Sequence, residues 1–263
     1  MVPLAVVGAT GRMGRRAVAL AAEHGLRVVA AVGSASSSHL GADAGRLAGL
    51  EPLGVPVVAP GPDAFGEAEV VLDVSLPEGL LRTLEALDGR ALVTGVTGLD
   101  ERLRLHLEAA AEQGPVLHAA NFSAGVQVLA ELVRRAAGAL PELDVEIVET
   151  HHRLKVDAPS GTALLLADAV AEARHQVRSS VVRHGREGAT GPRPPGEIGL
   201  HAVRGGDVVG EHTVWLLGEG ERLELGHVAT SRDTFVRGAL RAAAWLHDRP
   251  AGRYAFREVL GLA

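Results

Sequence analysis

A single lysine stands in the most polar stretch of the chain. Of the 26 Lys and Arg residues, only Lys155 is a lysine. An ammonium can shift its pKa and release a proton near neutrality, whereas a guanidinium stays charged. His151 and His152 lie just upstream, and histidine is the residue type most often used for proton transfer near neutrality. This stretch therefore predicts a site of proton transfer; the alternative is that an arginine-rich chain keeps its last lysine by chance.

The same stretch ends in a pattern that suits an anion. Residues 157–162 read Asp-Ala-Pro-Ser-Gly-Thr ahead of the apolar run Ala163–Ala171, which predicts the start of a helix. Free N–H groups there, together with the Ser160 and Thr162 hydroxyls and Lys155, would bind a carboxylate. A histidine beside a bound acid is suited to proton donation. For Ser160, capping of the helix alone is the alternative.

A glycine-rich turn near the start of the chain predicts a nucleotide site. Gly8, Gly11 and Gly14 follow a GxxGxxG spacing between a strand pattern and a helix pattern. In that context the glycines allow a tight turn, close approach of a pyrophosphate and close helix–strand packing. Free N–H groups at the start of the helix would then bind the phosphates, with Arg12 and Arg15 nearby as charge partners. A tight turn that binds nothing is the alternative.

The residues after the second predicted strand indicate the type of nucleotide. An acidic residue there would bind the adenosine ribose hydroxyls, but this chain has Gly33 and Ser34, followed by serines at 36–38. No carboxylate repels a 2′-phosphate, and the hydroxyls can donate to one. We therefore expect NADPH as cofactor, with NADH tolerated. A flexible serine loop without a nucleotide role is the alternative.

The first half of the chain alternates short Val/Leu runs with amphipathic stretches, which predicts a parallel sheet with crossover helices. The expected strands are Leu4–Val7, Arg27–Val32, Val55–Val58, Val70–Val74, Ala91–Val93 and Val116–His118; the expected helices are Arg12–His24, Pro77–Leu87, Asp100–Gln113 and Val126–Leu140. Turns containing Gly95, Val96 and Thr97 and Ala119, Ala120, Asn121 and Phe122 follow two of these strands, at the edge where ligands bind. Ordinary loop roles are the alternative for both turns.

The second half of the chain has a different pattern of apolar and polar residues. Asp144–Thr150, His212–Leu217 and Arg222–His227 alternate apolar and polar residues, as half-exposed strands do. Arg183–Gly199 has no periodicity and predicts a long functional loop, and Phe235–His247 predicts a helix that returns to the first domain. The fold class is thus α/β, with a Rossmann-type domain (1–122 and 232–263) and a smaller α+β substrate and oligomerisation domain (123–231) with a mostly antiparallel or mixed sheet.

Composition excludes several classes of function. The net charge of −6 argues against a nucleic-acid or membrane-surface role. The chain has no cysteine, so disulfides, thiolate catalysis and cysteine metal sites are absent. Four other histidines, His106, His118, His201 and His212, are interpreted as structural, and no metal is expected. The start shows no signal peptide and no apolar run spans a bilayer, so we expect a cytoplasmic protein.

Taken together, these residues resemble the dihydrodipicolinate reductase (4-hydroxy-tetrahydrodipicolinate reductase) family of bacterial lysine and diaminopimelate synthesis. The resemblance covers essentially the whole chain and is most specific at residues 149–163, with further matches at 119–123, 205–212 and 231–235. It implies an oxidoreductase that uses NADH or NADPH to reduce a small cyclic dicarboxylate, and that forms a homotetramer through the second domain's sheet.

The resemblance also implies residue roles. His151 is the proton donor and acceptor, and Lys155 is a proton donor. The dicarboxylate would contact His152, Gly161 and Thr162, beside the anion site of Ser160, with Arg232 near its carboxylate. The cofactor would contact residues 8–15, 95–97 and 119–122.

This chain departs from the family pattern at three places. Gly33 and Ser34 replace the frequent acidic residue, which is sometimes followed by arginine, so the cofactor preference stays open on this criterion. Val96 replaces the first threonine of the family's Gly-Thr-Thr-Gly turn, and Leu154 replaces a basic residue that is common in the family. The alternatives are another two-domain dehydrogenase of amino-acid metabolism and a non-catalytic NADPH-binding regulator. A regulator would have no reason to retain Lys155.

Overall fold

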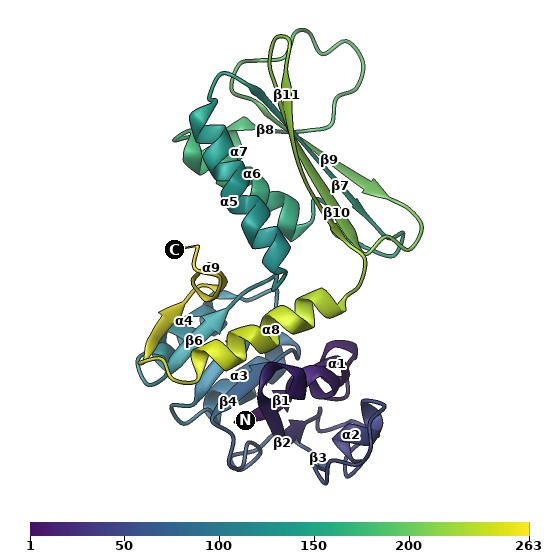
Figure 1. Ribbon diagram of the computed structural model, residues 1–263, viewed down its shortest axis with the longest axis vertical. Coiled ribbons are helices and arrows are strands. Elements are labelled where there is room, and N and C mark those ends of the chain that lie inside the picture. The colour runs from purple at the N-terminus through teal and green to yellow at the C-terminus, as the bar shows by residue number, and fades with distance from the viewer. Residues whose placement is uncertain (263) are drawn as a thin grey trace. The chain divides into compact units, whose positions relative to one another are not determined.

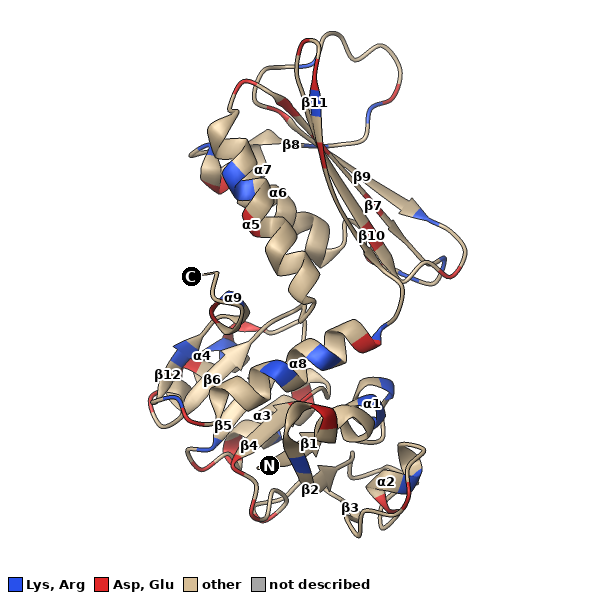
Figure 2. Ribbon diagram, viewed as in Figure 1, with Lys and Arg blue, Asp and Glu red and all other residues tan. Residues whose placement is uncertain are grey.

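The computed structural model describes residues 1–262 and divides the chain into two compact units. Unit 1 comprises Met1–Phe122 together with the chain from Asp233 onward, and unit 2 comprises Ser123–Arg232. Arg232, which the sequence assigned to the first domain, lies in unit 2. Figure 2 shows acidic and basic residues interspersed along both units. No helix within the described residues is both long and apolar enough to cross a membrane.

Unit 1 is built on a seven-stranded sheet with the order β12-β6-β5-β4-β1-β2-β3, and every pairing in it is parallel. Its strands are β1 (Val2–Val7), β2 (Leu26–Val32), β3 (Val57–Val58), β4 (Val70–Asp73), β5 (Ala91–Thr94), β6 (Pro115–His118) and β12 (Gly252–Tyr254). Strands β4 and β5 are buried at every position, as expected for parallel strands covered on both faces. The predicted Rossmann-type sheet is confirmed.

Helices cover both faces of this sheet (Figure 1). They are α1 (Arg12–Leu20), α2 (Ala44–Leu47), α3 (Pro77–Glu85), α4 (Glu101–Ala111), α8 (Asp233–Leu246) and α9 (Phe256–Val259). Leu4 and Val6 pack in one core with residues of α1 and α8, whereas Ala5 and Val7 pack in a second core with residues of α3 and α4. Alternate side chains of β1 thus contribute to opposite layers.

One predicted helix of unit 1 is shorter than expected. The pattern over Arg12–His24 predicted a continuous helix, but the α-helix ends at Leu20 and the last turn, Ala21–His24, is a 3-10 helix. Gly25 comes next with φ +73° and adopts the left-handed conformation that ends the helix. Amphipathic spacing does not distinguish the two helix types over a single turn.

The strand order of unit 1 reverses between β1 and β4, because the chain runs from β1 toward β3 on one side and from β4 toward β6 on the other. Ligands in open parallel sheets bind at the carboxyl ends of the strands beside this reversal. Those ends lead into the Gly8 turn after β1 and into Val74 after β4.

Unit 2 contains a five-stranded mixed sheet with the order β11-β10-β7-β9-β8. Its elements are β7 (Asp144–His151), β8 (Val182–His184), β9 (Ile198–Arg204), β10 (Gly210–Leu217), β11 (Arg222–Ala229), α5 (Ala124–Ala139), α6 (Gly161–Ala173) and α7 (Arg178–Val181). Strand β10 pairs antiparallel with β7 and β11, whereas β9 runs parallel to β7 and β8. The predicted mixed sheet is confirmed.

Alternation along β7 sets the two faces of this sheet. Val145, Ile147 and Glu149 are buried, and the residues between them are partly exposed. The buried face packs against α5 and α6, where Val145 and Ile147 share a core with Leu166 and other helix residues; Figure 1 shows both helices on one side of the sheet. Glu149 and His151 therefore point to the helix-covered side, since they are two residues apart.

The predicted loop Arg183–Gly199 is only partly a loop. Its ends belong to β8 and β9, and residues 185–197 form the irregular part between them. The prediction was wrong at both ends because β8 spans three residues and β9 contains Gly199, so neither shows a strand pattern. A Cβ at Gly199 would overlap the Glu146 carboxylate, so the glycine makes room for that group.

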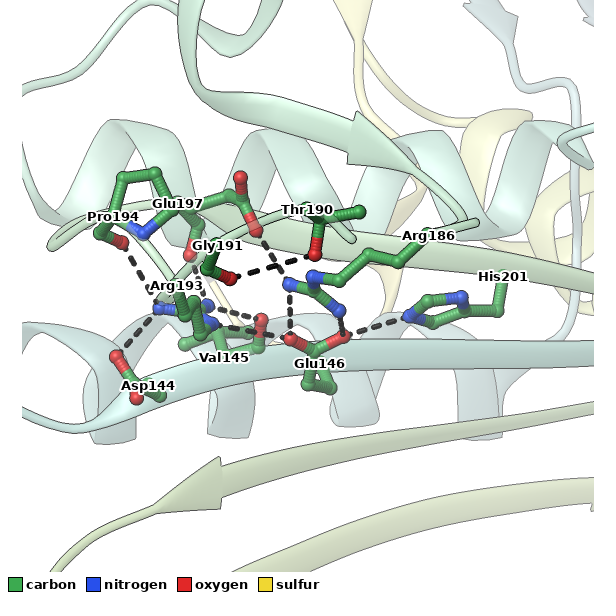
Figure 3. Close-up of polar contacts among 10 residues, drawn as sticks. All are labelled: Asp144, Val145, Glu146, Arg186, Thr190, Gly191, Arg193, Pro194, Glu197 and His201. Atoms are coloured by element: carbon green, nitrogen blue, oxygen red, sulfur yellow. Dashed lines mark hydrogen bonds and ion pairs between the residues drawn. The ribbon is translucent and has the colours of Figure 1, made fainter. Parts of the chain in front are cut away.

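Glu146 anchors this loop to the sheet through polar contacts with Arg186 and Arg193 (Figure 3). It lies on the face of β7 opposite the one that packs against α5 and α6. Its carboxylate accepts hydrogen bonds from Arg186 (2.8 Å), Arg193 (3.2 Å) and His201 (2.7 Å). Arg186 also binds Glu197 at 2.5 Å. Burial opposes ionisation of Glu146, but the three donors outweigh it and lower its pKa from 4.5 to about 2.

We predict that this cluster makes the stability of the protein fall in acid. Because the folded-state pKa of Glu146 is depressed, its contribution is complete above pH about 4.5 and is lost as the pH falls toward about 2. In thermal unfolding, Glu146→Gln should lower Tm at neutral pH, and its difference from wild type should shrink on acidification. The exposed Glu219, in the turn between β10 and β11, provides the control Glu219→Gln. A Tm difference independent of pH would contradict the prediction.

Candidate active site

The glycine turn after β1 has the geometry of a nucleotide-binding turn. Gly8 has φ +79°, which favours glycine, and Gly11 N donates to Gly8 O at 2.9 Å. A Cβ at Gly14 would overlap Gly8 O, so only glycine allows α1 to approach the turn this closely. No side chain caps α1 at Gly11, which leaves the first N–H groups of the helix available to an anion.

A cavity of about 680 Å³ opens beside this turn, within the size range of small-molecule sites. It is lined by residues from four segments of unit 1: Val7, Gly8, Thr10, Gly11, Arg12, Met13; Val32, Gly33, Ser34, Ala35, Ser36; Pro60, Gly61, Ala64, Phe65; and Val74, Ser75, Leu76, Glu78, Gly79, Arg82, Thr83. Most of the cofactor residues predicted after β1 and β2 are among them. The predicted residues Ala9 and Gly14 are buried behind the turn and do not line the cavity.

The region after β2 carries hydroxyls and no carboxylate toward the cavity. The Ser34 and Ser36 hydroxyls lie 3.0 Å apart, and Ser36 N donates to Ser34 Oγ at 3.2 Å. Arg12 lines the same cavity. Arg15 was expected beside the phosphates, but its side chain instead binds Thr10 O at 2.9 Å and lies 3.0 Å from His39 Nε2.

The two other predicted cofactor segments follow β5 and β6 and do not line this cavity. Val96 is buried and its carbonyl oxygen lies 2.9 Å from His118 Nε2, whereas Thr97 is exposed. Phe122 is buried and packs edge-on against Phe256 at a ring-centre distance of 5.2 Å. A cofactor contact at Gly95, Val96, Thr97 or Ala119, Ala120, Asn121, Phe122 therefore stays a prediction.

In unit 2, the fully buried Glu149 carboxylate organises the polar stretch. His151 Nδ1 lies 2.5 Å from Glu149 Oε2, and the Arg204 guanidinium donates to both carboxylate oxygens at 2.8 Å. Ser160 N donates to Oε1 at 3.0 Å. Burial opposes ionisation of Glu149, but these donors outweigh it and lower its pKa. The carboxylate thus holds its charge and fixes the His151 ring.

The contact with Glu149 orients the His151 ring so that its other nitrogen, Nε2, has space around it. Because Nδ1 faces Glu149, Nε2 is the nitrogen left for a reacting proton. A Cβ at Gly210 would lie 3.1 Å from His151 Nε2, so the glycine leaves space there. Burial lowers the pKa of His151, Glu149 opposes this shift, and the positive charges of Lys155 and Arg204 add to it.

His212, interpreted from the sequence as a structural histidine, lies in this cluster and not apart from it. Its ring is edge-on to His151 with centres 5.2 Å apart, and its Nε2 lies 3.1 Å from Ser160 Oγ. Burial lowers the pKa of His212 to about 4, which keeps it neutral near pH 7. Ser160 Oγ also accepts from Ala163 N and caps α6, which is the role that the sequence left as the alternative to substrate binding. A substrate contact of Ser160 stays a prediction.

Lys155 lies in the loop after β7 with its side chain largely covered. Its ammonium donates to both carboxylate oxygens of Asp157 at 2.8 Å. The lysine thus follows His151 closely in the same polar stretch, and its charge acts on that histidine. Gly161 and Thr162 form the first turn of α6, with Thr162 buried and Gly161 exposed.

His152 faces a different partner from His151. Arg232 Nη2 lies 3.2 Å from His152 Nε2, and His152 N donates to Val208 O at 2.8 Å. The structure therefore brings Arg232, the last residue of unit 2, to the histidine pair. Within the described residues, no group of three His, Cys, Asp or Glu is placed to hold a metal ion.

Sequence reasoning missed Glu149 and Arg204 as members of the site. A signal existed for Glu149, because residues two apart on a strand share a face and Glu149 precedes His151 by two. No local signal existed for Arg204, since its position depends on the pairing of β7 with β9, in which His151 lies opposite Arg204.

Comparisons with known proteins cover nearly the whole chain. Two family models match, "Dihydrodipicolinate reductase, N-terminus" at residues 2–122 and "Dihydrodipicolinate reductase, C-terminus" at residues 125–260. A 4-hydroxy-tetrahydrodipicolinate reductase of Halorhodospira halophila is 47% identical over 263 residues, 98% of each chain. Another, of an Anaeromyxobacter species, is 49% identical over 266 residues, covering 100% of this chain and 98% of the relative.

A solved structure agrees with these relatives. Dipicolinate-bound dihydrodipicolinate reductase from Paenisporosarcina sp. TG-14 superposes with a TM-score of 0.72 at 26% identity, covering 98% of each chain. The matches extend over both units and name a reductase in each case, so they do not favour the non-catalytic NADPH-binding regulator. The chain belongs to the dihydrodipicolinate reductase family of oxidoreductases.

Proposed function

We propose that this protein reduces 4-hydroxy-tetrahydrodipicolinate (dihydrodipicolinate) to tetrahydrodipicolinate in lysine and diaminopimelate synthesis, with NADPH or NADH as the hydride donor. The proposal rests chiefly on the His151 ring, which the buried Glu149 carboxylate holds in the same polar stretch as the only lysine. The names of the full-length relatives supply the substrate class.

The cavity beside the Gly8 turn fits the nucleotide. The close approach of Gly14 to Gly8 O and the uncapped start of α1 are the features that a pyrophosphate requires. A bound nicotinamide supplies the hydride. The chain's own contribution here is to bind and orient, through backbone N–H groups and the side chains that line the cavity.

Reduction of dihydrodipicolinate adds one hydride and one proton, and the hydroxylated substrate reaches that state by losing its hydroxyl group as water. The proton that accompanies the hydride is assigned to unit 2. His151 Nε2 is the atom that gives or takes it, since Nδ1 is held by Glu149. Lys155 is the second candidate donor of this one proton, because its ammonium charge acts on the same ring. The first turn of α6, at Ser160, Gly161 and Thr162, would bind one substrate carboxylate, and His152 with Arg232 is the second candidate group for the dicarboxylate.

The finer assignments concern the cofactor and the assembly. NADPH is the proposed preference. Ser34, Ser36 and Arg12 line the cavity, and the segment after β2 that carries the two serines contributes no carboxylate to it. A homotetramer through the sheet of unit 2 is proposed because the face opposite α5 and α6 exposes Val203 and Val228. A cytoplasmic location is also proposed for the protein.

Lys155→Arg tests the proton-donor role. The substitution keeps the positive charge but removes a group able to lose a proton, so kcat should fall by about 10²-fold or more while the Kd for NADPH stays unchanged. The reverse exchange at the exposed neighbour, Arg153→Lys, is the control and should turn over as wild type. Steady-state kinetics with the dicarboxylate and both variants give the result. Near-wild-type kcat for Lys155→Arg would remove the lysine from the mechanism.

Glu149→Gln tests the orientation of His151. The amide retains the size of the side chain but cannot balance Arg204 or hold the same ring orientation, so kcat should fall by about 10²-fold or more. Glu146→Gln is the matched control, because Glu146 lies on the same strand and also binds arginine and histidine, but on the opposite face. If both folded variants keep the wild-type kcat, Glu149 does not orient His151 for catalysis.

Ser34→Asp tests the cofactor preference. A carboxylate at this cavity position should repel a 2′-phosphate and accept from ribose hydroxyls, lowering kcat/KM for NADPH by about tenfold or more and sparing NADH. Ser38→Asp adds the same charge at an exposed residue that does not line the cavity. Equal effects of Ser34→Asp on both nucleotides would contradict a 2′-phosphate contact in this region.

A further inference from the structure

A buried carboxyl group lies beside the nucleotide cavity and has no part in the proton chemistry proposed above. Asp73 is the last residue of β4 and is fully buried. It pairs with Val7 of β1 and with Thr94 of β5, so it occupies the centre of the sheet at its carboxyl edge. This is the edge beside the reversal of strand order.

Asp73 accepts hydrogen bonds from two points of the chain that follows it, Ser75 and Thr83. Its Oδ1 accepts from Ser75 N at 2.8 Å, and its Oδ2 accepts from the Thr83 hydroxyl at 2.6 Å. Leu76, which precedes α3, gives that helix no side-chain cap. The Asp73 carboxyl therefore supplies the polar contacts that tie the turn after β4 to the second turn of α3.

The segment held in this way forms one wall of the cavity. Ser75, Gly79 and Thr83 all line it, spaced four residues apart along one side of α3 and the turn before it. A Cβ at Gly79 would overlap Ser75 Oγ, so this side is closely packed. The turn also lies against the glycine turn, because a Cβ at Gly8 would lie 3.0 Å from Val74 O.

The environment of the carboxyl suits a site for phosphates. Burial raises the pKa of Asp73, and the bonds from Ser75 and Thr83 only partly oppose this shift. The shift is toward the neutral form of the carboxyl, which repels a pyrophosphate less than the ionised form does.

We propose that Asp73 is a positioning residue for the nicotinamide nucleotide, which fixes Ser75 and Thr83 so that the α3 wall of the cavity stays aligned with the Gly8 turn. This inference rests on the proposed function in one respect, that the nucleotide occupies this cavity. Asp73 acts through the wall and not on the reacting atoms. Its loss should therefore weaken nucleotide binding and leave the dicarboxylate site of unit 2 unaffected.

Four substitutions test the proposal. Asp73→Ala and Thr83→Val remove the contact from either side, whereas Asp73→Asn and Thr83→Ser retain a hydrogen-bonding group of similar size. The Kd for NADPH and for NADH is measured by fluorescence titration, and KM is measured for each substrate. We expect Asp73→Ala and Thr83→Val to raise both nucleotide Kd values on the order of tenfold, with kcat at saturating nucleotide and KM for the dicarboxylate unchanged. Asp73→Asn and Thr83→Ser should restore most of the affinity.

Asp100→Ala controls for a general loss of stability. Asp100 also lies in unit 1 and caps α4 by accepting from Leu103 N at 2.8 Å, but it does not line the cavity. It should lower Tm without changing either Kd. Wild-type Kd values for folded Asp73→Ala and Thr83→Val, or no recovery in Thr83→Ser, would overturn the proposal. If Asp73→Ala does not fold, the nucleotide Kd values of Thr83→Val and Thr83→Ser decide whether the proposal holds. Failure of the wild-type protein to bind either nucleotide would instead overturn the proposed function.

Discussion

The candidate active site is organised around the buried carboxylate of Glu149. A charge without solvent is costly unless it is paired and fully hydrogen-bonded. Glu149 meets this condition with Arg204, Ser160 N and His151, which come from β9, the start of α6 and the end of β7. One carboxylate therefore joins three segments that are separate in sequence, and the same contacts orient the ring of the proposed proton-transfer residue.

The pKa values of the two buried carboxyl groups, one in each unit, are shifted in opposite directions. Glu149 has a lowered pKa because Arg204 pairs with it, whereas burial raises the pKa of Asp73, whose hydrogen-bond partners are the neutral Ser75 and Thr83. Glu149 lies beside the proposed proton-transfer residue His151, and Asp73 lies beside the cavity proposed to bind the nucleotide. Each shift follows from the partners that the fold brings to the carboxyl group.

The features that the sequence predicted well are local. Val/Leu runs separated by amphipathic stretches predicted the parallel sheet, and the spacing of Gly8, Gly11 and Gly14 predicted the turn beside the cavity. Features that depend on long-range pairing could not be predicted from local patterns. Arg204 reaches Glu149 only because β9 pairs with β7, and His212 reaches His151 only through β10. The short β8 and the glycine in β9 lack a strand pattern, so the loop between them was predicted too long.

A working reductase differs from a protein that only binds the nucleotide in one measurable respect, which is turnover. The decisive assay follows oxidation of NADPH and of NADH by the wild-type protein, with and without 4-hydroxy-tetrahydrodipicolinate, beside a titration of nucleotide binding. We expect oxidation that requires the dicarboxylate and saturates with it. Binding of the nucleotide without oxidation of either form in the presence of the dicarboxylate would contradict the proposed reaction.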